Sequence, residues 1–225
     1  MSKKVLIVAA HPDDEILGCG GTIKKLISSG NCIYVLFLTD GESSRNNKDI
    51  KKNINNRKEC AKNALNFLGC QELFFANFHD NQMDTIRLLK IVQYLEGIIK
   101  EIEPEIIYTH SPCDLNIDHA KTHQAVITAC RPLQTSPVKQ IFTFEISSSS
   151  EWNFSQNEYL FKPNWFEDIS PFIDDKIKAI NFYQNELRSW PHPRSVKAIK
   201  NLSIYRGATI AVDYAEAFNL IFNKS

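Results

Sequence analysis

The chain has 225 residues, of which 43% are hydrophobic and 23% are charged, as is typical of a globular domain. Its 26 basic and 26 acidic residues cancel, which argues against a general electrostatic attraction to nucleic acid. No apolar run approaches the length of a membrane span, and the first four residues leave no room for a signal peptide before the first apolar run. Six scattered cysteines without C-x-x-C spacing are typical of reduced thiols, so we expect a cytoplasmic protein.

Short apolar segments and longer helical patterns alternate over the first 130 residues. Such alternation predicts a mostly parallel sheet with right-handed crossovers, that is, a Rossmann-like three-layer α/β/α sandwich. Three glycines early in the first helix, Gly18, Gly20 and Gly21, suggest either close packing or a ligand near the backbone there. The predicted strands cover residues 5–9, 32–38, 72–75 and 106–109, and the predicted helices cover 15–29, 54–68, 84–102 and 118–130.

The pattern weakens after residue 130. We expect a strand over 140–146, a helix over 172–188 and a terminal helix over 213–222. A polar loop over 40–53 is the longest one predicted in the first part. No repeat or linker divides the chain, so the prediction is a single domain over 1–225. In it, residues 1–130 form the core with the metal motifs, and 131–225 form a variable part that completes the substrate pocket.

The segment His11-Pro12-Asp13-Asp14-Glu15 follows the first strand directly. A helix N-terminus needs one capping acid, whereas this segment brings three acids and an imidazole together. Such a cluster is costly to bury unless something compensates its charge, and a divalent cation would do so. We therefore favour a functional interpretation of the segment.

Three further polar motifs follow the next three strands, and the carboxyl ends of parallel strands are where ligands bind in such sheets. These motifs cover residues 39–42, 78–84 and 114–119. His11, Asp14 and His119 would supply two imidazoles and one carboxylate and leave one position open, which is the ligand pattern of a catalytic zinc site. Zinc lowers the pKa of bound water to about 7, and Asp13 is the acid best placed to take its proton. The residues thus favour metal-assisted hydrolysis.

His123 lies four residues after His119 on a predicted helix, so the two imidazoles are a second candidate metal pair. A helix-surface role or a supporting role beside the metal is the favoured interpretation of His123. The tryptophans at 152, 165 and 190 are candidates for stacking on a sugar, although core and rim positions are favoured for at least two of them.

The signature from Ala10 to Gly21 resembles the PIG-L/LmbE family of zinc-dependent N-acetylglucosaminyl deacetylases. That family includes the deacetylases of glycosylphosphatidylinositol, mycothiol and bacillithiol synthesis. Further matches lie at residues 39–42, at 57–59 with 68–69, and at 118–119, so the resemblance covers about the first 130 residues. It implies an N-deacetylase that acts on a GlcNAc-type amino sugar conjugate, with Zn²⁺ or another divalent metal as cofactor.

The resemblance also implies roles for individual residues. It places the metal on His11, Asp14 and His119, the general base at Asp13, and sugar contacts at Arg57 and Asp80. Arg57 is as readily an ordinary charged residue of a helix. In relatives the motif before Asp118-His119 often begins with a histidine, and Asn116 occupies that place here.

Asn116 is able to donate a hydrogen bond to an oxyanion, but it cannot deliver a proton. We therefore expect a histidine to protonate the leaving amine. His192 in the proline-flanked segment 190–194 is the first choice, and His110 at the end of the fourth strand is the second. Arg194, in the same segment as His192, is a candidate for substrate binding.

Two alternatives remain at this point. One keeps zinc hydrolysis but acts on a thiol conjugate or another amide. The other is a non-catalytic receiver-like regulator, which also places paired acids after its first strand. The expected partner is a small-molecule amino sugar conjugate, with neither nucleic acid nor a membrane span. The oligomeric state stays open, although small homo-oligomers are common among family members.

Overall fold

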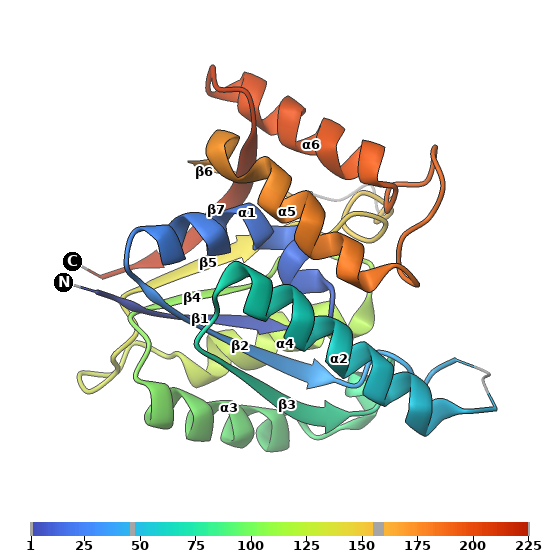
Figure 1. The fold of residues 1–225 in the computed structure, drawn as a ribbon. Coiled ribbons are helices and arrows are strands. Elements are labelled where there is room, and N and C mark those ends of the chain that lie inside the picture. Colours follow the sequence, from blue (N-terminus) through green and yellow to red (C-terminus); the bar gives the residue numbers. More distant parts are fainter. Residues whose placement is uncertain (1, 46–47, 155–159, 225) are drawn as a thin grey trace.

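Seven strands form one mixed sheet in the order β3-β2-β1-β4-β5-β7-β6 (Figure 1). The computed structural model describes residues 2–45, 48–154 and 160–224. Strands β1 to β5 run parallel, whereas β7 is antiparallel to both β5 and β6. The strands are β1 Lys4–Ala9, β2 Cys32–Thr39, β3 Glu72–Phe78, β4 Ile106–His110, β5 Gln140–Phe144, β6 Trp165–Asp168 and β7 Ala215–Asn223.

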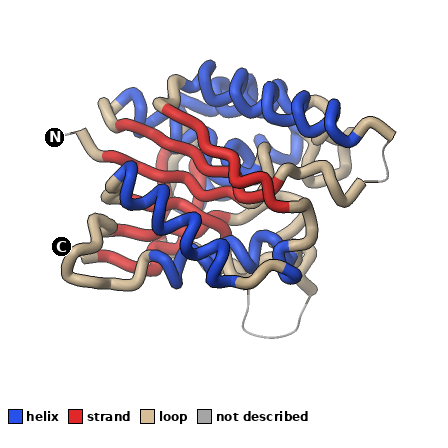
Figure 2. The backbone as a smooth tube through the Cα atoms, turned by 90° about the horizontal axis from the view of Figure 1, so that it is seen from below, coloured by secondary structure: helices blue, strands red, loops and turns tan. Residues whose placement is uncertain are grey.

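Helices cover both faces of this sheet, which gives the predicted three-layer sandwich (Figures 1 and 2). Helices α1, α2, α5 and α6 pack on one face, and α3 and α4 pack on the other. The helices are α1 Asp14–Ser28, α2 Ile50–Leu68, α3 Leu88–Ile102, α4 Ile117–Ala129, α5 Ile173–Ile180 and α6 Val196–Thr209; short 3₁₀ turns occupy Met83–Thr85, Ser170–Phe172 and Asn181–Tyr183.

Strand β1 shows why the sequence forms a two-sided core. Val5, Ile7 and Ala9 belong to the core under α1, while Leu6 and Val8 belong to the core under α3. Successive side chains of a strand point to opposite faces, so a strand covered on both sides is apolar at every position. The continuous apolar run before His11 is therefore the signature of a central strand.

Helix α1 is kinked at Cys19, whose φ is −148° and ψ is 24°. The glycines on either side allow close packing, as predicted. A Cβ on Gly18 would lie 2.5 Å from the ring of Phe144, and a Cβ on Gly21 would lie 2.7 Å from Ile169. These two glycines let α1 lie directly on β5 and on the chain that follows β6.

The kink frees backbone groups that the C-terminal part of the chain satisfies. Glu216 of β7 accepts hydrogen bonds from the amides of Gly21 (2.9 Å) and Thr22 (2.7 Å). Lys176 of α5 donates to the carbonyl of Leu17 (3.0 Å) and pairs with Glu216 (2.6 Å). All of these groups are buried, so residues from the last quarter of the chain complete a helix of the first.

The terminal segment corrects one prediction. The expected helix over 213–222 is wrong, because Ala215–Asn223 forms β7 between β5 and β6. Alanine and glutamate favour helix locally, but pairing on both sides of the strand overrides that preference. The helix expected over 172–188 ends at Ile180 and continues as a single 3₁₀ turn. Strand β6 and helix α6 were not predicted.

The loop after β2 is shorter than predicted, because α2 begins at Ile50 rather than at residue 54. Residues 46 and 47 of this loop lie outside the described part of the chain. Among the described helices, none combines the length and the apolar character that crossing a membrane requires.

Replacing Lys176 by Met tests the coupling between α5, β7 and the kinked helix. The change leaves Glu216 buried without its charge partner, and breaking a buried pair in this way costs about 3–5 kcal/mol. Urea unfolding followed by circular dichroism should show this loss. Lys178→Met, an exposed lysine of the same helix, is the matched control. Equal stabilities of the two variants would contradict the coupling.

Candidate functional site

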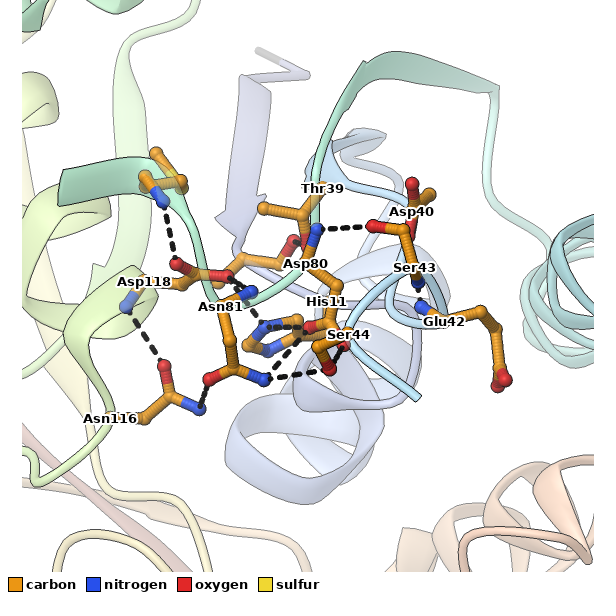
Figure 3. Close-up of polar contacts among 12 residues, drawn as sticks. His11, Thr39, Asp40, Glu42, Ser43, Ser44, Asp80, Asn81, Asn116 and Asp118 are labelled. Atoms are coloured by element: carbon orange, nitrogen blue, oxygen red, sulfur yellow. Dashed lines mark hydrogen bonds and ion pairs between the residues drawn. The ribbon is translucent and has the colours of Figure 1, made fainter. Parts of the chain in front are cut away.

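The four polar motifs predicted after the first four strands meet at the carboxyl edge of the sheet, where the strand order changes direction between β1 and β4. Strand β1 lies between β2 and β4, so the loops after β1 and β4 flank a crevice at the carboxyl edge of the sheet. Ligands bind at this position in open α/β sheets. The loops after β2 and β3 lie against the same crevice, and Figure 3 shows their side chains around His11.

The turn after β1 holds Asp13 in a conformation that L-residues rarely adopt, with φ at 133°. Two hydrogen bonds within the motif fix the turn. The amide of His11 donates to the Asp14 carboxylate, and the amide of Asp13 donates to Glu15, both at 2.9 Å. Backbone strain of this kind costs about 1–3 kcal/mol and persists where the surroundings over-determine it.

His11, Asp14 and His119 bring three ligand atoms together. Nδ1 of His11 lies 3.1 Å from Oδ2 of Asp14 and 3.1 Å from Nε2 of His119. The third side of the triangle, from Nε2 of His119 to Oδ2 of Asp14, is 3.3 Å. Ligands about 2.0–2.2 Å from a tetrahedral zinc ion lie about 3.3–3.6 Å from one another, so this triangle has nearly the right size.

The outer nitrogen of each histidine faces a carboxylate. Nε2 of His11 lies 3.1 Å from both Asp118 and Asp80, and Nδ1 of His119 lies 3.0 Å from Asp114. Histidine ligands of metals usually donate their second N–H to a carboxylate in this way, which fixes the ring and its tautomer. The pairing therefore leaves Nδ1 of His11 and Nε2 of His119 free to face a metal.

The supporting carboxylates are themselves held in place. Asp118 accepts from the amides of Asn81 (2.7 Å) and Met83 (3.1 Å), which joins α4 to the loop after β3. Asp114 accepts from the hydroxyls of Ser149 and Ser150. Burial raises the pKa of Asp114, but the charge and hydrogen bond of His119 outweigh it and bring the value to about 2.

Two other groups of side chains also have the composition of metal ligands, but the structure favours the trio of His11, Asp14 and His119 over both. One contains His110, whose Nε2 already accepts a hydrogen bond from the amide of Ala10 at 2.9 Å. The other contains Asp80 and Asp118, which are occupied by His11 and by backbone amides. Oδ1 of Asp14 is buried without a hydrogen-bond partner among the described residues, as expected of an atom beside a cation. The trio of His11, Asp14 and His119 thus fits a divalent metal.

Asp13 lies between two guanidinium groups. Oδ1 is 3.2 Å from Arg57, and Oδ2 accepts a hydrogen bond from Arg194 at 3.0 Å. Burial raises the pKa of Asp13 above its usual value, although both arginines lower it. A buried carboxylate with a raised pKa and a fixed orientation suits a general base.

The contacts of Arg57 are mainly with other residues of the protein, although the resemblance implied that it contacts the sugar. Its side chain is 5% exposed, Nε donates to the carbonyl of Pro12 (2.6 Å), and the guanidinium pairs with Glu186 and Glu42. Glu186 also accepts two hydrogen bonds from Arg45, at 2.9 and 2.8 Å. Arg57 therefore anchors the turn that carries Asp13.

A cavity of about 170 Å³ opens above these groups and is lined almost entirely by polar side chains. Asn116 lies on its wall at the N-cap of α4, where Oδ1 accepts from the amide of Asp118 at 2.8 Å. This bond orients the amide nitrogen outward, toward Asn81 (Figure 3). The cavity is lined by His11, Asp13, Gly41, Ser44, Arg45, Arg57, Asp80, Asn81, Asn116 and Arg194, so it contains most of the residues predicted to bind or react.

The two histidines predicted as acids lie differently. His110 is fully buried, and burial together with the neighbouring His119 lowers its pKa well below the usual value. Because its Nε2 accepts a hydrogen bond from the amide of Ala10, this nitrogen carries no proton to donate, and His110 is poorly suited to act as the acid. His192 is absent from the cavity lining, and its ring lies edge-on against Trp152, 5.5 Å away. The segment after residue 190 delivers Arg194 to the cavity instead.

Two further predictions concern side chains near the site. His123 bonds to the carbonyl of His110 at 2.9 Å and belongs to none of the described metal-ligand groups, as its supporting interpretation implies. None of the three tryptophans is buried, since Trp152, Trp165 and Trp190 are 37%, 40% and 54% exposed.

Several residues that complete the site were not singled out from the sequence. Asp114 and Asp118 lie in the predicted motif over 114–119, and their positions five residues and one residue before His119 are a usable sequence signal. Glu186, Arg45 and Tyr183 carried no recognisable signal. Tyr183 donates to Glu15 at 2.5 Å, and Glu15 in turn accepts from the amide of Asp13.

Comparison with known proteins agrees with this geometry. Residues 6–130 match the model of the PIG-L family, described as GlcNAc-PI de-N-acetylase. The chain is 32% identical over 189 residues to the uncharacterized deacetylase YaiS of Escherichia coli K12. The match covers 81% of this chain and 91% of that protein. The match does not support a receiver-like regulator.

Solved structures share the fold. N,N′-diacetylchitobiose deacetylase from Pyrococcus horikoshii superimposes with a TM-score of 0.79 at 21% identity, covering 98% of this chain and 84% of that one. The 4-carboxy-2-hydroxymuconate hydratase GalB from Pseudomonas putida superimposes with a TM-score of 0.77 at 22% identity, covering 99% and 98%. A hydratase on this fold shows that the reaction depends on the site rather than on the fold.

Replacing Tyr183 by Phe tests whether Glu15 and Tyr183 hold Asp13 in its strained conformation. Loss of the hydroxyl leaves a buried carboxyl without one donor, so the free energy of unfolding should fall by about 1–3 kcal/mol. Tyr205→Phe, at an exposed tyrosine, is the control. Urea unfolding measures the loss, and an unchanged midpoint relative to the control would argue against the support.

Proposed function

The chain belongs to the PIG-L family, and on that premise we propose that it is a zinc-dependent hydrolase that removes the N-acetyl group from a GlcNAc-type amino sugar conjugate. One observation carries the proposal. A metal-sized triangle of His11, Asp14 and His119 adjoins a cavity into which Asp13 also opens. The family's description and the disaccharide named for the Pyrococcus enzyme support GlcNAc as the substrate class.

A cation on the triangle would polarise the acetamide carbonyl and lower the pKa of a water molecule. Zn²⁺ is the proposed ion, because two imidazoles and one carboxylate form a donor set that it favours. The outer carboxylates Asp80, Asp118 and Asp114 keep the two imidazoles in the tautomers that this role requires.

Asp13 accepts the proton of the attacking water as the oxygen bonds to the carbonyl carbon. Arg57 and Arg194 hold its two oxygens from opposite sides, which limits the directions in which the carboxylate can turn. As the carbon–nitrogen bond breaks, the protonated Asp13 returns the proton to the amine. Its raised pKa suits both halves of this task.

Asn116 donates its outward amide N–H to the developing oxyanion. The N-cap bond to Asp118 fixes which end of the amide faces the cavity, so the donor is oriented before substrate binds. Arg194 and Asp80 both line the cavity, which supports keeping both as proposed substrate-binding residues. The cytoplasmic location and any homo-oligomeric state stay predictions.

Replacing Asp13 by Asn tests the base. The amide is nearly the same size but cannot accept the proton, so we expect the protein to keep its fold and its zinc while kcat falls by about 10²–10⁴. Acetate release from a panel of GlcNAc conjugates gives the rate, and elemental analysis gives the metal content. Full activity in this variant would refute the assignment.

His192→Ala, measured in the same assay, tests whether His192 protonates the leaving amine. With the proton returned by Asp13, the variant should retain activity within about 10-fold of the native rate. A loss as large as that of Asp13→Asn would make His192 the acid that the sequence first indicated. The two variants therefore decide which group protonates the leaving amine.

Replacing Asp114 by Asn tests the metal trio through its support. Weakening an outer carboxylate of a histidine ligand lowers metal affinity by about 10–100-fold. Competition with a zinc-binding dye measures the change without relying on activity. Asp84→Asn, at an exposed acid outside the cluster, is the control, and equal affinities in both variants would exclude the proposed role of His119.

A further inference from the structure

A second and larger cavity lies beside the catalytic one. It occupies about 660 Å³ between α2 and residues 181–186, which follow α5. Ligand sites usually measure about 300–1,000 Å³, so the catalytic cavity of about 170 Å³ is small for a whole sugar conjugate. Arg45 and Arg57 line both cavities, so the two spaces adjoin.

The cavity exists because α2 presents polar side chains where a packed helix normally presents apolar ones. At the end of α2, Phe67 packs against Phe182 with ring centres 6.0 Å apart, and the two walls meet. Toward the start of α2 the same stripe carries Asn53, Asn56, Cys60 and Asn63, and the walls separate. The opposite wall adds three more amides, at Asn181, Gln184 and Asn185.

The charged side chains that line the cavity are already paired. Glu42 pairs with Arg45 and Arg57, and Glu59 pairs with Lys62. Glu186 accepts from both terminal guanidinium nitrogens of Arg45 and pairs with Arg57, and Glu186 and Arg57 are both buried. No surplus of positive charge is therefore left for an anionic ligand. The remaining amides each donate and accept hydrogen bonds, which matches the hydroxyl groups of a neutral polyol. Phe182, 40% exposed at one edge, offers an apolar face of the kind on which sugar rings pack.

We propose that this cavity, called the α2 groove, binds a neutral saccharide portion of the substrate beyond its acetylated sugar. The inference rests on the proposed function for the identity of that substrate. The site itself is argued from its amide lining, its paired charges and its position next to the catalytic cavity.

A double variant of the groove and a matched double variant of the same helix test the proposal. Asn56→Ala with Asn63→Ala removes two amides of the lining, whereas Asn55→Ala with Asn66→Ala removes two exposed amides of α2 outside it. The probes are two neutral tetrasaccharides, cellotetraose and the β-1,4-linked GlcNAc tetramer. Both are titrated calorimetrically into Asp13→Asn protein, so that no turnover interferes.

Loss of two hydrogen bonds should weaken binding of at least one tetrasaccharide by about 5–100-fold in the groove variant, with little change in the control variant. Equal binding by the two variants, or binding of neither tetrasaccharide to the parent protein, would overturn the proposal. In otherwise native protein, the groove variant should raise KM for the GlcNAc tetramer and leave acetate release from GlcNAc itself unchanged.

The two proposals fail separately. Absence of acetate release from every acetylated sugar would refute the deacetylase function, yet cellotetraose carries no acetyl group and its binding would still decide the groove. Conversely, acetate release with identical kinetics in both double variants would keep the function and remove the groove.

Discussion

The site depends on the compensation of buried negative charge. Asp13, Asp14, Asp80, Asp114 and Asp118 are each at most 7% exposed and lie within one small region. Carboxylates in such surroundings are stable only when they are paired and hydrogen-bonded. The structure supplies imidazoles on one side of the cluster and guanidinium groups on the other.

As a result, the adjacent residues Asp13 and Asp14 have different charged partners and pKa values shifted in opposite directions. Asp14 faces His11 and His119, which together outweigh its burial and lower its pKa well below the usual value. Asp13 faces Arg57 and Arg194, yet its pKa is raised. The strained turn sends the two neighbouring side chains in these different directions, so one carboxylate suits a cation and the other suits a proton.

The sequence predicts the part of the site that lies in short segments after buried strands. His11, Asp13 and Asp14 are adjacent, and His119 follows the strand that pairs with β1, so strand order alone brings them together. Glu186 and Tyr183 lie more than 150 residues from Asp13, in and just after a short 3₁₀ turn, and no periodicity marks them. Their roles follow from packing against α2, which the sequence does not display.

The missed elements have a similar cause. Helix α6 buries Ile199, Ser203 and Gly207, spaced by four residues. Only the first of these is a large apolar residue, so the helix gives no amphipathic pattern. Strand β6 has only four residues and pairs with β7 alone. Strand β7 begins with an alanine- and glutamate-rich stretch that favours helix, because Glu216 is needed inside to bind the amides of the kinked α1.

The C-terminal part therefore does more than close a pocket. It supplies Arg194 to one oxygen of Asp13, and Glu186 to the arginine that holds the other. A change at Arg194 or Glu186 would alter both the cavity and the orientation of Asp13, since Arg57 and Arg194 line the cavity and also bind the Asp13 carboxylate. In the proposed mechanism, substrate binding and proton transfer are thus linked through Arg57, Arg194 and Glu186.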